Sequence, residues 1–391
     1  MEQGEFILQH RIDWALFVEL AIAHGVVSIL HHNLSIVKPA GLPDDILAQL
    51  RVFAHVNALR NLVLTQDLLR LLKFLSDNNV SAIPFRGPTL SVQVYDDSSF
   101  RQFGDLDILV HRKDFLKARN LLLSEEYLRG TLSNGLESFE NHDLRRMKRL
   151  GEYSPQHSSE LISIDLYGRL AGGVFPALAS NFESLGDDLI SISLLDTQVN
   201  TFSPETLLIY LCICGSKDGW TRLSWMCDVA ALISHHAEIN WSHVFEEAQR
   251  LDSTQMLLLG LTLAKETLNL ALPDTAERYI QTHFTNMSLT TQLYQRLMRG
   301  FDYCSVDNEH RFNVDLQLIE DKKDQLRHRI RCALDWLILI IQPNPLDQAF
   351  LELPRQFYGI YYLIRPIRLV LKLVAIKKSS KRRSLVYLGH D

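Results

Sequence analysis

The sequence predicts an α+β protein in which a small mixed sheet is framed by helical regions on either side along the chain. Short apolar segments typical of strands fall within residues 81–170, where one helical segment and a long polar connection separate them. Before and after them, apolar residues recur at the three- and four-residue spacing of helices. We therefore expect an N-terminal helical region (1–80), an α/β core (81–200), a C-terminal helical domain (201–375) and a basic tail (376–391).

The first helical region leads directly into the core. The segment "VNALRNLVLTQDLLRLLKFLSDNNV" has helical periodicity and ends at "DNN", a typical helix stop. "SAIPF" is then a short strand, and "RGPTLSVQVY" is a turn that leads into a short helix. "DLDILV" is the second strand, "RKDFLKARNLLLSEEYL" an amphipathic helix and "LISIDLYGRL" the third strand.

The C-terminal domain begins with a clear helix start. Ser203 is a typical N-cap residue, Pro204 suits the first helical position, and Glu205 is favourable in the first turn. Helical patterns continue through "LSWMCDVAALISHH", "NWSHVFEEAQRL" and "TQMLLLGLTLAKETLNL". They extend to about residue 375, with breaks at "QPNPLD" and "LIRPIR". With no low-complexity linker before it, this domain is expected to pack against the core.

Composition excludes some classes of protein. The 391 residues are 47% hydrophobic and 22% charged, and a net charge of −6 argues against a general nucleic-acid binder. The basic segment 365–383 is better explained as a solvated chain end than as an RNA or anionic-membrane contact. Five cysteines without a regular framework indicate reduced thiols in a cytoplasmic protein. The N-terminus lacks the apolar core of a signal peptide, and "ALDWLILII" is too short to span a bilayer.

Two acids on an otherwise apolar strand indicate either a cation site or an exposed, solvated strand end. Side chains alternate along a strand, so Asp105 and Asp107 in "DLDILV" point to the same face. Burying such neighbouring like charges is costly unless a cation compensates them. A third acid, Asp165, lies within the apolar segment "LISIDLY". Three carboxylates from two neighbouring strands suit Mg²⁺. Two such ions about 4 Å apart can clamp a phosphoryl displacement.

Basic and glycine residues near these acids favour a phosphate ligand. Arg86, Gly87 and Pro88 precede a short helix, whose N-terminus would suit a phosphate. Arg101 stands just before the acidic strand, and its guanidinium could hold a phosphate in a bidentate manner.

The segment "GSKDGWTRLSW" has two interpretations. Trp220 could stack on a base while Lys217 or Arg222 contacts phosphate, or the segment could be an interhelical loop with Trp220 and Trp225 in the core. Cys212 and Cys214 are two residues apart on a helix and do not face each other, so structural thiols are favoured over zinc ligands.

The order of these motifs resembles the DNA polymerase beta-type nucleotidyltransferase superfamily. More specifically, it resembles a bacterial group of uncharacterised proteins described as "nucleotidyltransferase family protein". The resemblance runs over roughly residues 50–372 and rests on five blocks: "FRGPTL", "RQFGDLDILV", "SIDLYGRL", "LLIYLCICGSKDGWTRLSWMCDVAALI" and "LPRQFYGIYYLIRPIRL".

The resemblance implies transfer of a nucleoside monophosphate from an NTP, with ATP favoured, to an acceptor hydroxyl, with release of pyrophosphate. It assigns both metal ions to Asp105 and Asp107, and the catalytic ion to Asp165, with Mg²⁺ expected and Mn²⁺ as an alternative. Its nucleotide-binding residues would be Arg86, Gly87, Arg101 and Lys217. The acceptor stays open between a protein, a small molecule and an RNA.

The sequence departs from the group at several positions. Pro88 follows the turn glycine, Arg86 replaces a lysine, and Tyr167, Cys214 and Asp218 replace histidines. Two alternative functions therefore stand beside the enzyme: a catalytically weak nucleotide-binding sensor or partner module, and a toxin-like transferase that acts on tRNA ends.

Overall fold

The structure of the protein is a computed structural model. It describes residues 12–39, 41–95, 98–124, 152–153, 163–168 and 188–298, together with isolated positions between 314 and 368. The chain divides into two compact units, Met1–Leu318 and Ile319–Asp391. The elements and the site described below belong to the first unit. The expected boundaries at residues 80 and 200 both fall inside it and stay predictions.

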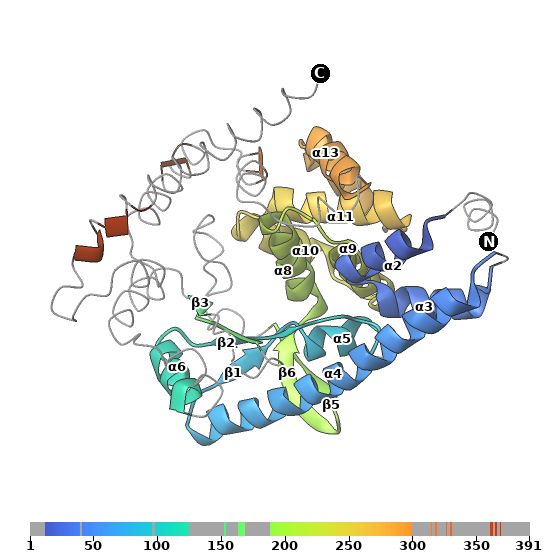
Figure 1. Ribbon diagram of the computed structural model, residues 1–391. Coiled ribbons are helices and arrows are strands. Elements are labelled where there is room, and N and C mark those ends of the chain that lie inside the picture. The colour runs from blue at the N-terminus through green and yellow to red at the C-terminus, as the bar shows by residue number, and fades with distance from the viewer. Residues whose placement is uncertain are drawn as a thin grey trace. The chain divides into compact units, whose positions relative to one another are not determined.

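Helices precede and follow a small group of strands (Figure 1). The helices are α2 (Trp14–Ala23), α3 (Val27–Val37), α4 (Asp44–Asp77), α5 (Pro88–Val94), α6 (Phe115–Ser124), α8 (Pro204–Lys217), α9 (Leu223–His235), α10 (Trp241–Arg250), α11 (Thr254–Leu268), α12 (Asp274–His283) and α13 (Met287–Met298). The strands are β1 (Ala82–Pro84), β2 (Asp105–Val110), β3 (Glu152–Tyr153), β4 (Ser163–Tyr167), β5 (Leu189–Leu194) and β6 (Thr197–Phe202). The predicted α+β class is confirmed.

The main sheet has the strand order β1-β2-β4-β3 and is mixed, as predicted. β2 pairs with β4 in parallel, whereas β1 and β3 run antiparallel to their neighbours. β5 and β6 form a separate antiparallel hairpin. The Thr201 hydroxyl donates a hydrogen bond of 2.7 Å to the Pro84 carbonyl, which ties this hairpin to the end of β1.

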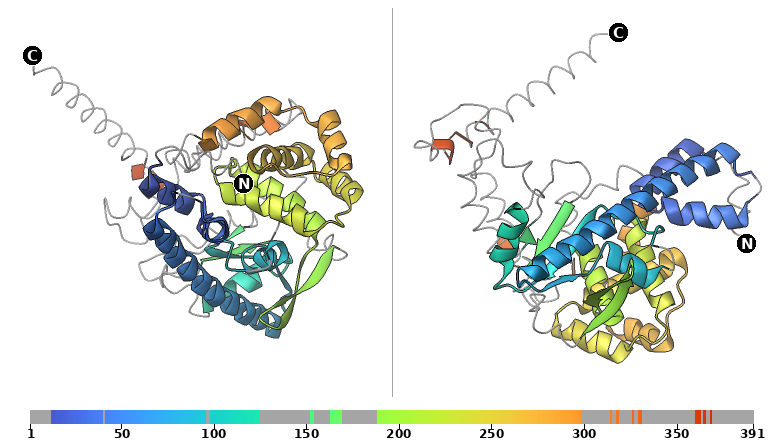
Figure 2. Two further views of the ribbon diagram at one scale, coloured as in Figure 1. Left: turned by 90° about the vertical axis from the view of Figure 1, so that its right-hand side faces the viewer. Right: turned by 90° about the horizontal axis from the view of Figure 1, so that it is seen from below.

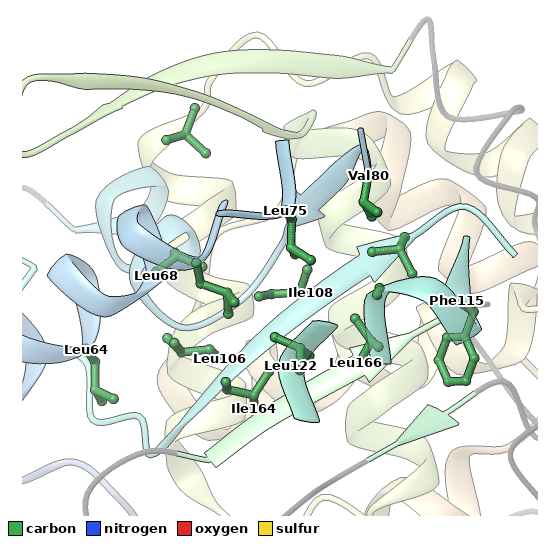
Figure 3. Close-up of a cluster of buried hydrophobic side chains, with 14 of the residues drawn as sticks. Leu64, Leu68, Leu75, Val80, Leu106, Ile108, Phe115, Leu122, Ile164 and Leu166 are labelled. Atoms are coloured by element: carbon green, nitrogen blue, oxygen red, sulfur yellow. The ribbon is translucent and has the colours of Figure 1, made fainter. Parts of the chain in front are cut away.

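One face of the main sheet carries the apolar core. Leu106, Ile108 and Val110 alternate along β2 and pack against the inner sides of α4 and α6 (Figure 3). The two helices contribute Leu64, Leu68, Leu71, Leu75, Phe115 and Leu122, which are at most 5% exposed. Fully burying each such side chain stabilises the fold by roughly 1.5–3 kcal/mol. Because side chains alternate, Asp105 and Asp107 project from the opposite face.

The long helix α4 starts and ends where its sequence allows. Asp44 and Asp45 occupy the first turn, where carboxylates interact favourably with the helix dipole. Asn78 caps the C-terminus, and Asn79 follows with a positive φ of 54°. The stop at "DNN" is thus confirmed, and the two views of Figure 2 show the helix running beside the strands.

The start of the C-terminal helices is also confirmed. The Ser203 hydroxyl accepts a hydrogen bond from the Thr206 amide at the N-terminus of α8.

Trp220, in the turn after α8, is only 1% exposed and donates to the Ser216 hydroxyl at 3.2 Å. Its ring fills the space left by two glycines, Gly215 and Gly260. Trp220 therefore belongs to the core, and the interpretation in which it stacks on a base is wrong.

Other predictions concern residues outside the described ones. These are the helices expected after Met298, including "ALDWLILII", and the basic tail. Among the described residues, no helix combines the length and apolar character that crossing a membrane requires.

Candidate active site

The strand register brings the three predicted acids to one face of the sheet. Asp107 on β2 is the direct partner of Asp165 on β4, and Asp105 lies two residues before Asp107 on the same strand. Neighbouring strands lie roughly 4.8 Å apart, and alternate residues on one strand roughly 6.6 Å apart. Asp107 is buried, while Asp105 and Asp165 are half-buried. The acids thus extend from the sheet interior towards its accessible edge.

Asp107 is the most perturbed of the three. Burial raises the pKa of this carboxyl to about 7, and the negative charges of Asp105 and Asp165 act in the same direction. The Arg86 guanidinium and a hydrogen bond from Tyr167 oppose this rise. Arg86 Nη1 lies 3.4 Å from Asp107 Oδ1. Arg86 therefore compensates part of the charge that burial disfavours on Asp107.

The donor set fits a divalent ion such as Mg²⁺. Asp107 Oδ2 is buried and has no hydrogen-bond partner. An orphaned carboxylate oxygen of this kind is costly unless a cation or donor approaches it. Its neighbours across the strands are also carboxylates, the ligands that Mg²⁺ prefers. However, no group of three or more acidic, histidine or cysteine side chains in the described residues is already placed as metal ligands are.

Gly87 allows the turn before α5 to approach β2 closely. Its φ is +55° and its ψ −123°, a conformation that side-chain-bearing residues rarely adopt. A Cβ atom there would lie 3.1 Å from the Asp105 carbonyl oxygen. The neighbouring Phe85 amide donates to the Asp107 carbonyl at 3.3 Å. The glycine therefore keeps Arg86 next to the acidic strand.

One stripe of α8 faces this group. Tyr210, Cys214 and Lys217 follow the spacing that places residues on one side of a helix. Burial raises the pKa of the Cys214 thiol, while the charges of Arg86 and Lys217 lower it. Burial also raises the pKa of Tyr210, and among the charges that act on Tyr210 are those of Asp107 and Arg86. Lys217 therefore lies at the C-terminal end of a stripe that begins beside Asp107.

Aromatic rings close the apolar side of the site. Phe85 is fully buried and stacks on Phe202 with ring centroids 5.0 Å apart. Tyr167 and Tyr210 contact the Phe85 ring edge-on at 5.4 and 4.9 Å. These rings keep water away from Asp107, which is the physical cause of its raised pKa.

Arg101 has a different environment from the other predicted phosphate ligands. Its Nε atom donates to both oxygens of Asp228 on α9, at 3.1 and 3.0 Å, and its side chain is 6% exposed. The Tyr95 hydroxyl lies 3.4 Å from the same carboxylate. The pair links the loop before β2 to the helical region, and a phosphate contact by Arg101 stays a prediction. Sequence reasoning did not identify Asp228, although an acid within the apolar helix "LSWMCDVAALI" indicates a buried cation partner.

Three of the cysteines lie among the described residues. Cys212, Cys214 and Cys227 are free thiols. The described residues contain no cluster of ligands that includes these cysteines and could hold zinc. The structural interpretation of the cysteines stays a prediction.

A mixed sheet with acids on two adjacent strands and a glycine turn beside them is the arrangement that the resemblance to nucleotidyltransferases implies. Residues 10–269 match the model of a family described as uncharacterised nucleotidyltransferase, well over half of the chain. The protein belongs to this family.

A crystal structure of an antigenic nucleotidyltransferase-like protein from Paracoccidioides brasiliensis is 14% identical, with a TM-score of 0.32, and the match covers 59% of this chain and 95% of that one. No curated protein matches the sequence.

Proposed function

We propose that the protein transfers a nucleoside monophosphate from an NTP, with ATP favoured, to an acceptor hydroxyl in a Mg²⁺-dependent reaction that releases pyrophosphate. The observation that carries this proposal is the register in which Asp107 and Asp165 are direct partners on parallel strands. Asp105 lies on the same face, so three carboxylates come together there, and the family to which the chain belongs is described as nucleotidyltransferases.

The three acids have distinct proposed roles. Asp105 and Asp107 would hold metal, and the half-buried Asp165 would complete the set on the side that an acceptor can reach. When bound, Mg²⁺ would supply positive charge for the phosphates and lower the pKa of the acceptor hydroxyl. Mn²⁺ has similar ligand preferences and is an alternative ion.

Arg86 is proposed to act on the phosphates. Its guanidinium now compensates Asp107 at 3.4 Å, and its side chain is 20% exposed. The side chain is thus partly accessible, and a guanidinium can bind a phosphate through two parallel hydrogen bonds. Gly87 would bring its backbone close to the same group, because no side chain keeps the ligand away.

Lys217 and Arg101 are proposed to lie further from the three acids than Arg86 does and to affect the phosphates less directly. The Lys217 ammonium is proposed to stabilise charge that develops on the leaving pyrophosphate. Arg101 is engaged with Asp228, so its contribution would be mainly to position the loop before β2. Arg86 also acts on Asp228 electrostatically, which places this pair within reach of the site.

A second candidate is a nucleotide-binding sensor or partner module with weak catalysis. The observation that favours it is that the acids in the described residues are not already arranged as metal ligands. Tyr167, where the resembling group has histidine, also binds Asp107 through its hydroxyl. Both observations suit a site that binds a nucleotide without rapid turnover.

Labelled nucleotides distinguish the two candidates. The protein is incubated with each NTP labelled at the α-phosphate, with Mg²⁺ or Mn²⁺ and a cell lysate, and pyrophosphate release and labelled products are measured. Transfer that depends on the metal and disappears in Asp165→Asn supports the enzyme and identifies the acceptor class. Saturable NTP binding without pyrophosphate release supports the binding module. Neither binding nor release would contradict both candidates.

A further inference from the structure

The helix α4 has a second apolar face, which points away from the core. Val52, Val56, Leu59 and Val63 are 60%, 59%, 67% and 46% exposed. Such a row of large apolar side chains on one exposed helix face typically marks a contact surface. In the right-hand view of Figure 2 the helix is visible along most of its length beside the strands.

The exposed face has the spacing of a coiled-coil seam. Its residues are separated by alternating steps of four and three positions, which is the heptad spacing of a helix that packs against another helix. The seam residues, all exposed, are Asp45, Gln49, Val52, Val56, Leu59, Val63, Gln66 and Arg70. The buried leucines of α4, such as Leu64 and Leu68, lie on the opposite side and already belong to the core.

The order of residue types along the seam is almost the same from either end. The outermost residues are Asp45 and Arg70, which carry opposite charges, and the next residues inward are both glutamine. Two valines, Val52 and Val63, come next, followed by Val56 and Leu59 around the midpoint. If a second copy of the helix packs antiparallel against the first, apolar residues of the two copies meet in the centre of the seam. At each end, Asp45 of one copy meets Arg70 of the other.

We propose that α4 is a self-association surface that pairs with α4 of a second copy in an antiparallel arrangement. The two-fold axis would pass between Val56 and Leu59, so that each contact occurs twice, as in an isologous interface. A parallel arrangement would set Asp45 against Asp45 and Arg70 against Arg70, which is unfavourable. The charge pattern therefore favours a second copy of α4 as the partner, in the antiparallel orientation.

The size of the seam sets the strength of the association. From Asp45 to Arg70 the helix rises about 38 Å, and a strip roughly 10 Å wide along it covers about 400 Å² per copy. Phe53 and Leu62, 39% and 44% exposed, widen the strip on its two sides. Stable interfaces bury about 800 Å² per partner, so the dimer is expected to be weak, with a dissociation constant in the micromolar range.

Sedimentation of the full-length protein over a range of concentrations tests the surface. The wild type is expected to pass from monomer to dimer, and Val56→Glu is expected to remain monomeric at every concentration because it places a charge at the midpoint. Ile36→Glu is the matched control, since Ile36 is 68% exposed on α3 but lies outside the seam, and it should dimerise like the wild type. Circular dichroism checks that each variant is folded. A wild type that is monomeric throughout, or equal dimerisation of Val56→Glu, would overturn the proposal.

Charge reversal tests the direction. Asp45→Arg and Arg70→Asp are each expected to weaken dimerisation about tenfold, because each places like charges together. The combined variant is expected to regain dimerisation close to that of the wild type. Arg70 also pairs with Asp67 of its own helix at 3.6 Å, and the combined variant lacks that contact too, so recovery reports the contact between copies. No recovery in a folded combined variant would reject the antiparallel arrangement.

Discussion

Asp107 on β2 and Asp165 on β4 are direct partners in a pair of parallel strands, and their side chains project from the same face of the sheet. Asp107 is buried beside Arg86, while Asp165 is half-buried. Asp107 therefore lies where burying a charge costs free energy, whereas Asp165 lies where a ligand can reach it.

Replacing Asp107 should abolish turnover and leave the fold intact. Asp107→Asn removes one carboxylate from the proposed metal site, and we expect Mg²⁺-dependent pyrophosphate release to fall at least about 100-fold. Without metal the variant should melt at the same temperature or above the wild type at pH 8, because a buried charge beside Asp105 and Asp165 is removed. Activity assays and thermal melts measure the two effects. Asp44→Asn, in the exposed first turn of α4, is the control, and wild-type turnover in Asp107→Asn would contradict the metal site.

The ion pair between Arg101 and Asp228 should contribute mainly to stability. Arg101→Met leaves a buried carboxylate without its cation, which typically costs about 3–5 kcal/mol. Combining it with Asp228→Leu removes the stranded charge, so urea denaturation should show that the double variant is more stable than Arg101→Met alone.

The same double variant separates structure from ligand binding. If Arg101 only positions the loop before β2, the double variant should change the affinities for NTP and for the nucleoside by the same factor. A selective loss of NTP affinity in the folded double variant would instead support the phosphate contact expected from the sequence.

Much of the core was predictable because its signals are local. β1, β2, β4 and the helix stop after Asp77 all follow from apolar runs and turn residues within a few positions. The hairpin of β5 and β6 was not predicted. Its two turn residues, Leu195 and Asp196, have φ values of 45° and 65°, and the usual glycine or asparagine is absent from both positions.

The sequence predicted which residues form the candidate site, but not which residues they contact. The face shared by Asp105 and Asp107 follows from strand alternation alone, whereas the pairing of Asp107 with Asp165 depends on a register that no local pattern determines. Asp228 lies 127 residues from Arg101, and only the folded chain shows that they meet. Trp220 was ambiguous because an aromatic residue in a polar turn suits both a core and a ligand site.

Acid should weaken the junction between the N-terminal helices and α9 through His24. This side chain is 9% exposed, and its Nδ1 accepts a hydrogen bond from the Leu223 amide at 3.3 Å. Burial and the charge of Arg222 lower the pKa of His24 below its ordinary value of 6.5. Below about pH 6.5 the imidazole of His24 binds a proton in the unfolded chain but not in the folded chain. The free energy of unfolding is therefore expected to fall as the pH decreases from about 7 to 5.

A conservative variant isolates this effect. His24→Asn keeps an acceptor at a similar position and cannot titrate, so it should lose less stability between pH 7 and pH 5 than the wild type in thermal melts. An equal loss in both proteins would show that other groups, such as His31, whose pKa is also lowered, cause the acid sensitivity.

Lys217 should affect the rate of transfer more than the affinity for NTP. It is the last residue of α8, and its charge acts on Cys214, as does that of Arg86. An ammonium at this end of the stripe suits a group on which negative charge develops during the reaction, and such an interaction lowers the barrier without strengthening ground-state binding. Lys217→Met should therefore lower kcat by about 10- to 100-fold and change KM little, whereas Lys217→Arg should recover part of the rate. Steady-state kinetics with the acceptor found by labelling measure both constants. A rise in KM at unchanged kcat would mean that Lys217 binds the nucleotide uniformly, and unchanged values of both would make α8 a scaffold.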